Sequence, residues 1–97
     1  MLHIVNKSPF STSSLESCVR VAQKDEPILL IEDGVLSVIE NSTAASIVKD
    51  AQKDHVVYAL SADIKARGID RVVAGVKVID YAGFVELVEQ HKPMSWL

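Results

Sequence analysis

The sequence predicts a three-layer α/β/α domain with a mostly parallel sheet of four to five strands. Two observations lead to this fold class. Short aliphatic runs alternate with amphipathic segments along the whole chain, and one run, Ile28-Leu29-Leu30-Ile31, is apolar at four consecutive positions. A strand that is apolar on both faces is typical of a parallel sheet covered by helices, with right-handed crossovers between its strands. The 97 residues contain no linker, so we expect a single domain over residues 1–97.

The first strand is expected at Leu2–Val5, an aliphatic run that Asn6-Lys7-Ser8-Pro9 ends. Ser13 followed by Glu16 matches the capping box that begins many helices. Because apolar residues at helical spacing follow it, we expect the first helix over about residues 14–24.

The run after Pro27 predicts the second strand, which Glu32-Asp33-Gly34 ends. Asp33 is expected to cap a short helical turn, and Ser42 or Thr43 is expected to cap the helix that follows. One apolar stripe marks that helix: Ala44, Ile47, Val48 and Ala51.

A third strand is expected over residues 55–60. Ser61 then suits the N-cap of a helix, and Gly68 suits its C-terminal end. Residues 69–74 are compatible with a short extra strand.

The run Val76–Ile79 predicts a further strand. Asp80 is expected to cap the last helix, which Pro93 ends. The tail after Pro93 is rich in large apolar side chains, although chain ends are usually polar and loose. We therefore expect Met94, Trp96 and Leu97 to form an interface with a neighbouring chain, with packing back onto the domain as the alternative.

The apolar content predicts association with other chains. Hydrophobic residues make up 48% of the sequence. A domain of this size hides only about two thirds of the surface that its unfolded chain exposes. Some apolar surface must therefore stay exposed or be covered by another chain, and we expect oligomerisation.

Charge and termini limit the remaining classes of function. The net charge is −3, and the ten basic residues are scattered, so direct nucleic-acid binding is not expected. The start of the chain lacks the pattern of a signal peptide, and no apolar run reaches the roughly 20 residues that span a bilayer. The one cysteine has no partner for an internal disulfide, which favours a reducing cytoplasm.

Cys18 lies beside the apolar stripe of the first predicted helix, and two interpretations are open. Free cysteine is among the most buried residue types, so Cys18 can be a small core residue. Alternatively, it is a thiolate that accepts sulfane sulfur, with a pKa lowered by the helix dipole and by Lys7 and Arg20. Because the chain has no second cysteine to resolve a persulfide, any sulfur taken up must leave to a thiol of another protein.

Polar residues also follow the predicted strands, at the edge where α/β domains bind ligands. They are Asn6, Glu32, Asp33, Ser61, Asp63 and Asp80. The same residue types cap helices and form turns, which is the interpretation we favour.

We expect neither a metal nor a cofactor. The three histidines (His3, His55 and His91) lack the spacing of a metal site and are expected to be structural. The four glycines form neither a dinucleotide-binding nor a phosphate-binding loop.

Six strings, in order and over essentially the whole chain, resemble the DsrH/TusB family of sulfur-relay subunits. They are Asn6-Lys7-Ser8-Pro9-Phe10, Ser14-Leu15-Glu16-Ser17-Cys18, Glu32-Asp33-Gly34, Ala66-Arg67-Gly68, Asp80-Tyr81-Ala82-Gly83-Phe84-Val85 and Ser95-Trp96-Leu97.

The resemblance implies a small cytoplasmic subunit of the DsrE/DsrF/DsrH-like fold. It implies assembly with two homologous subunits, DsrE or TusD and DsrF or TusC, into a heterohexamer that passes persulfide sulfur to a small carrier, DsrC or TusE. The sulfur serves 2-thiolation of the tRNA wobble uridine in TusB-like members, or dissimilatory sulfur oxidation in DsrH-like members. The principal sulfur-bearing cysteine of such complexes lies on the DsrE/TusD subunit, so this chain is expected to be a non-principal subunit.

Cys18 is the one functional position that the resemblance transfers to this chain. It matches a cysteine that DsrH-type members carry on their first helix. The resemblance therefore implies an auxiliary thiol able to carry persulfide sulfur, and it favours the DsrH branch or a Tus complex whose third subunit also holds a thiol.

Three alternatives remain beside this assignment. The domain can be a stand-alone small-molecule-binding module that uses the polar strand ends and has no role in sulfur transfer. Cys18 can instead be the main nucleophile of a sulfurtransferase. Without its sister subunits, the chain can also form a homo-oligomer.

Overall fold

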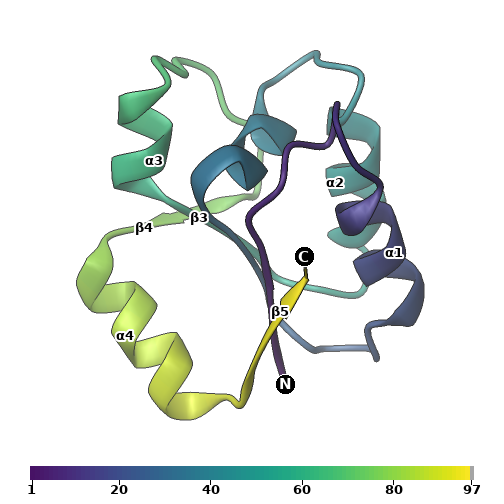
Figure 1. The fold of residues 1–97 in the computed structure, drawn as a ribbon, viewed down its shortest axis with the longest axis vertical. Coiled ribbons are helices and arrows are strands. Elements are labelled where there is room, and N and C mark those ends of the chain that lie inside the picture. The colour runs from purple at the N-terminus through teal and green to yellow at the C-terminus, as the bar shows by residue number, and fades with distance from the viewer. Residues whose placement is uncertain (97) are drawn as a thin grey trace.

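Five parallel strands form one sheet in the order β4-β3-β2-β1-β5, with helices on both faces. The computed structural model describes residues 1–96 (Figure 1). Along the chain the elements are β1 (Leu2–Val5), α1 (Ser14–Val21), β2 (Ile28–Leu30), the 3-10 helix η1 (Glu32–Val38), α2 (Ala45–Ala51), β3 (Val57–Leu60), α3 (Ser61–Ala66), β4 (Lys77–Ile79), α4 (Tyr81–Gln90) and β5 (Pro93–Trp96). The predicted three-layer α/β/α class is confirmed.

The connections explain which helix covers which face. From β1 to β4 each new strand adds on the same side of its predecessor, so right-handed crossovers place α1, η1, α2 and α3 on one face. The chain then returns across the sheet to pair β5 with the other side of β1. Reversing the direction of travel reverses the face, and α4 therefore lies on the opposite side (Figure 1).

Each face has its own apolar cluster, and the two differ in size. The larger cluster joins the covering helices to inward residues of the strands, and it includes Val5, Cys18, Leu30, Val48 and Ile64. The smaller cluster consists of Leu2, Ile4 and Leu29 under Leu87 of α4. One sheet face is therefore covered by four elements and the other by α4 alone.

The C-terminal tail forms an edge strand. Pro93 pairs with Leu2 and Trp96 pairs with Val5 in parallel register. Proline is tolerated here because an edge strand needs no N–H on its outer side. Trp96 thus packs back onto the domain, whereas Met94 pairs through its backbone and exposes its side chain, and Leu97 lies outside the described residues.

Three predicted caps are wrong, and a fourth, Ser61, is the first residue of α3 rather than its N-cap. Ser13 precedes α1 with φ −102° and ψ 22°, and its side chain makes no capping bond. An N-cap side chain reaches the first turn from an extended backbone, which Ser13 does not adopt. Ala44 precedes α2 without a side-chain cap, so neither Ser42 nor Thr43 fills that role, and Asp33 lies inside η1, which follows Ile31.

Other predicted boundaries are confirmed or shifted. Asp80 caps α4 by accepting a hydrogen bond from the Gly83 N–H at 2.9 Å. Gly68, with φ +63°, follows α3, which begins at Ser61 itself rather than after it. The first helix stops at Val21, where the chain becomes extended. Residues 69–74 form only an isolated bridge between Val72 and Ile39.

Gly34 marks a close approach between η1 and the end of β1. A Cβ atom at this position would lie 2.2 Å from the Val5 carbonyl oxygen. That oxygen accepts a hydrogen bond from Ile31 N–H, so the backbone cannot move aside without breaking the link between β1 and β2.

We therefore expect Gly34→Ala to lower the free energy of unfolding by about 3 kcal/mol. Gly68→Ala is the matched control: its Cβ would meet nothing within 4 Å, and only the positive φ opposes it. The control should cost about 1 kcal/mol. Urea denaturation of both variants measures the difference, and equal losses would show that the close approach is not a constraint.

Candidate functional site

The Cys18 side chain lies in the larger apolar cluster, on the inner face of α1. It is fully buried, as is Val48 of α2 in the same cluster. Cys18 is in the middle of the helix rather than in its first turn, so the N-terminal end of the helix dipole does not act on it strongly. In this conformation the thiol has no path to a sulfur donor.

Burial sets the protonation state of this thiol. Desolvation, with a smaller contribution from the charge of Glu26, raises the pKa of Cys18 from 9.0 to about 12. The expectation of a lowered pKa is therefore wrong. Lys7 is exposed in the loop after β1, and Arg20 lies on the outer side of α1, so neither compensates for the lost hydration.

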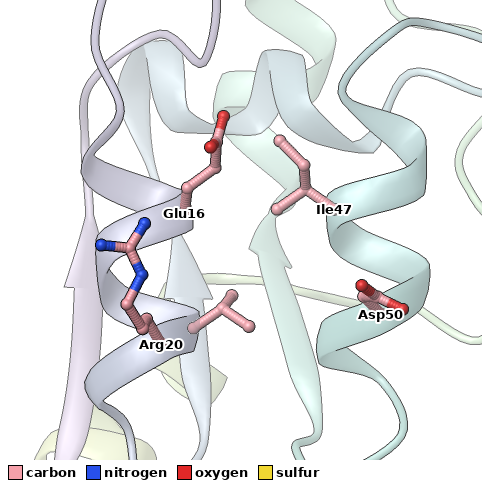
Figure 2. A pocket seen from close by; sticks show the side chains of 5 residues that line it. Glu16, Arg20, Ile47 and Asp50 are labelled. Carbon is pink, nitrogen blue, oxygen red and sulfur yellow. The ribbon is translucent and has the colours of Figure 1, made fainter.

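Arg20 instead lines a groove between α1 and α2 (Figure 2). Val19 and Ile47 supply its apolar part, and Glu16 and Asp50 add carboxylates to the guanidinium of Arg20. Its volume of about 300 Å³ is at the lower limit of ordinary ligand pockets. The mixed charges select no single class of ligand.

At the carboxyl ends of the strands, three of the predicted polar residues come together around Arg67. Its Nη2 lies 2.9 Å from Asp33 Oδ1, and its Nη1 lies 3.6 Å from Asp63 Oδ1. Asp63 Oδ2 also accepts the Glu32 N–H at 2.8 Å. These bonds join η1 to α3, so the carboxylates are used within the fold rather than presented to a ligand.

The other predicted strand-end residues do not join this cluster. Asp80 caps α4. Ser61 is the first residue of α3, and Leu60, which precedes it, has no side-chain group that could cap the helix. Asn6 Oδ1 is buried at the end of β1, and no side chain or backbone group of residues 1–96 forms a hydrogen bond with it. The six residues therefore do not form one binding site.

A second polar cluster lies at the opposite edge of the sheet, and sequence reasoning did not assemble it. The Trp96 indole N–H donates to His3 Nδ1 at 3.0 Å, and His3 Nε2 lies 2.9 Å from Glu26 Oε1. The Met1 amine lies 3.3 Å from Glu26 Oε2, and His55 Nδ1 lies 2.7 Å from the Glu26 carbonyl oxygen. His3 and His55 are buried, which agrees with their expected structural role.

Glu26 is the charged centre of this cluster. Its hydrogen bond with His3 is the largest cause that lowers the pKa of Glu26 from 4.5 to about 2, followed by the hydrogen bond from Gln23 N–H. Glu26 is therefore ionised throughout the ordinary pH range. A contact between residues 3 and 96 has no short-range signal, which is why the sequence did not reveal it.

Large apolar side chains remain exposed, as the composition predicts. On α4, Tyr81 is 63% exposed and Val85 is 52% exposed, one turn apart. Met94 on β5 is 38% exposed, and Phe10 protrudes from the loop after β1. These side chains lie on α4, on the edge strand β5 and in the loop between β1 and α1.

Residues 1–96 contain neither a metal-binding cluster nor a membrane-spanning helix. No group of three or more histidine, cysteine, aspartate or glutamate side chains is arranged to hold a metal ion there. Within the same part of the chain, no helix has the length and apolar character that crossing a bilayer requires.

The chain belongs to the DsrH family. The model of that family, described as DsrH like protein, matches residues 7–94. Protein TusB of Photorhabdus laumondii subsp. laumondii is 39% identical, over 99% of this chain and 100% of its own length. Protein TusB of Escherichia coli (strain K12 / DH10B) is 31% identical with the same coverage.

Solved structures share the fold at lower identity. The ychN protein from E. coli superposes with a TM-score of 0.76 at 16% identity, over 97% of each chain. MTH1491 from Methanobacterium thermoautotrophicum gives a TM-score of 0.73 at 19% identity, over 97% of this chain and 95% of its own. At such identities the likeness is one of fold.

The raised pKa of Cys18 predicts a specific dependence of stability on pH. Between pH 9 and 12 the unfolded chain releases the thiol proton while the native chain keeps it, so this contribution to the free energy of unfolding is complete below pH 9 and is lost as the pH rises. The expected slope from this one group is about −1.4 kcal/mol per pH unit.

Cys18→Ala removes that slope, so the stability of the wild-type chain should fall more steeply than that of the variant in urea titrations above pH 9. Taking the difference cancels the titration of lysines and tyrosines, which both proteins share. Parallel curves for the two proteins would contradict the burial of the thiol.

Proposed function

We propose that this chain is a non-principal subunit of a cytoplasmic sulfur-relay complex, and that its work is assembly and docking. The observation that carries the proposal is similarity to proteins named TusB over 99% of this chain and 100% of each relative. The burial of Cys18 then favours a supporting role over a chemical one.

The partners we propose are two homologous sister subunits, DsrE/TusD-like and DsrF/TusC-like, in a heterohexamer, and a DsrC/TusE-like sulfur carrier. The TusB names of the relatives favour 2-thiolation of the tRNA wobble uridine as the destination of the sulfur. Cys18, which by itself favours the DsrH branch and sulfur oxidation, weighs less once it is buried.

Cys18 retains at most an auxiliary part in this proposal. A thiol with a pKa of about 12 is protonated at neutral pH, and a protonated thiol is a poor nucleophile. For Cys18 to carry a persulfide, α1 would have to move away from the sheet. The principal nucleophile is therefore assigned to a sister subunit.

The interface we propose includes the C-terminal strand. Met94 exposes its side chain on an edge strand, and exposed edges with apolar side chains are suited to burial by another chain. Trp96 packs partly against the domain's own core, so it supports this surface more than it extends it. Leu97 is included on its position in the sequence alone.

Co-expression with the two sister subunits tests the proposal. We expect the three chains to co-purify as one species in size-exclusion chromatography, and Met94→Glu to reduce the recovered complex at least about tenfold, because a buried unpaired charge costs more than 1.4 kcal/mol. Val78→Glu is the matched control, since Val78 is exposed on β4, the edge strand at the opposite side of the sheet. A chain that stays monomeric beside its sisters would end the proposal. Equal recovery of both variants would remove β5 from the interface and leave the assembly intact.

A further inference from the structure

The hydrogen-bond donors around His3 fix its protonation state. An indole nitrogen can only donate, so His3 Nδ1, 3.0 Å from Trp96 Nε1, must be an acceptor without a proton. The ring proton of the neutral imidazole is then on Nε2, from which it is donated to Glu26 Oε1 at 2.9 Å. The relay from Trp96 through His3 to Glu26 is complete only while His3 is neutral.

We propose that this relay is a proton-sensitive latch: neutral His3 holds β5 against β1 through Trp96, and a proton added at Nδ1 releases the C-terminal strand. The added proton comes from solvent and occupies the lone pair that accepts the indole N–H. Two N–H groups then face each other, and the half-buried indole is left without its acceptor. An unsatisfied donor in such a place is unfavourable, so the strand separates from His3.

The position of the latch explains why one proton matters to β5. The strand is short and lies at the edge of the sheet, so β1 is its only strand neighbour. Its residues before Trp96 are exposed and bury little apolar area. Trp96 therefore supplies most of the side-chain packing of β5 on the larger apolar cluster, and its hydrogen bond with His3 orients that packing.

Among residues 1–96, Trp96 is the group hydrogen-bonded to His3 Nδ1, and the charged and titratable groups nearby lie elsewhere. Glu26 and the Met1 amine form one ion pair beside it, and His55 reaches the Glu26 carbonyl oxygen rather than His3. From α1, Cys18 is neutral in the core, whereas Glu16 and Arg20 are exposed on the outer side of the helix. Three further charged side chains on the neighbouring segments are exposed: Lys24, Asp25 and Lys92.

Glu26 opposes the release, because its carboxylate attracts a protonated imidazole. That attraction keeps His3 in place as it becomes charged, so the change is confined to the Trp96 side of the ring. Imidazole is the side chain that ordinarily changes charge between about pH 5 and pH 8, and this sets the pH range of the test.

Trp96 is the only tryptophan, so its fluorescence reports the latch in the full-length chain. Between about pH 8 and pH 5, we expect one reversible step in emission, with a constant far-UV circular dichroism signal. His3→Gln should remove the step, because the amide can accept from Trp96 and donate to Glu26 but does not titrate. His91→Gln, outside the relay, should keep it.

Hydrogen exchange of the β5 amides gives a second reading. After correction for the intrinsic rate, exchange should be about tenfold faster at the acid end in the wild-type chain, as expected for loss of roughly 1.4 kcal/mol. In Trp96→Phe, which has no indole N–H, the corrected rates should be equal at both ends. A step that persists in His3→Gln, a step that coincides with loss of the far-UV signal, or equal wild-type exchange rates would each overturn the latch.

Discussion

The parallel pairing of β5 with β1 places the first and last strands side by side and determines how the rest of the molecule is covered. Because β5 is reached by reversing the direction in which strands are added, α4 must cross the face that the other helices leave free. The same pairing brings Trp96 to His3 and makes β1 an internal, fully buried strand of the sheet. One face is closed by four elements, and the other is closed by a single helix with apolar side chains still exposed.

Because the two sheet faces are covered unequally, one face holds a closed core and the other presents apolar surface that another protein can cover. The well-covered face encloses the only thiol and keeps it protonated. At the polar strand ends, where a ligand pocket is usual in α/β domains, Arg67 binds Asp33 and Asp63. What remains available to other molecules is surface: the edge strand β5 and the outer side of α4. A subunit of this kind contributes contacts to an assembly more readily than it contributes chemistry.

Local patterns predicted the sheet, because runs such as Leu2–Val5 and Ile28–Leu30 are apolar enough to require burial on both faces. The caps were harder to predict, since whether Ser13 can cap α1 depends on backbone angles that the preceding loop imposes. The sequence places Cys18 beside the apolar stripe of its helix. A small rotation of the helix about its axis decides whether a residue at that position is buried or exposed, and the structure shows Cys18 buried. The contact of Trp96 with His3 spans 93 residues of sequence, and no local signal marks it.

The most direct test of this account is sulfur transfer by the assembled relay containing the Cys18→Ala variant of this chain. The complex of three subunits would be given a sulfane donor, and delivery of sulfur to the carrier protein would be followed by intact-protein mass spectrometry. The account predicts delivery at the wild-type rate, with no added sulfur on the wild-type form of this chain during turnover. Loss of delivery in the variant, together with a persulfide found on Cys18 in the wild-type complex, would contradict it.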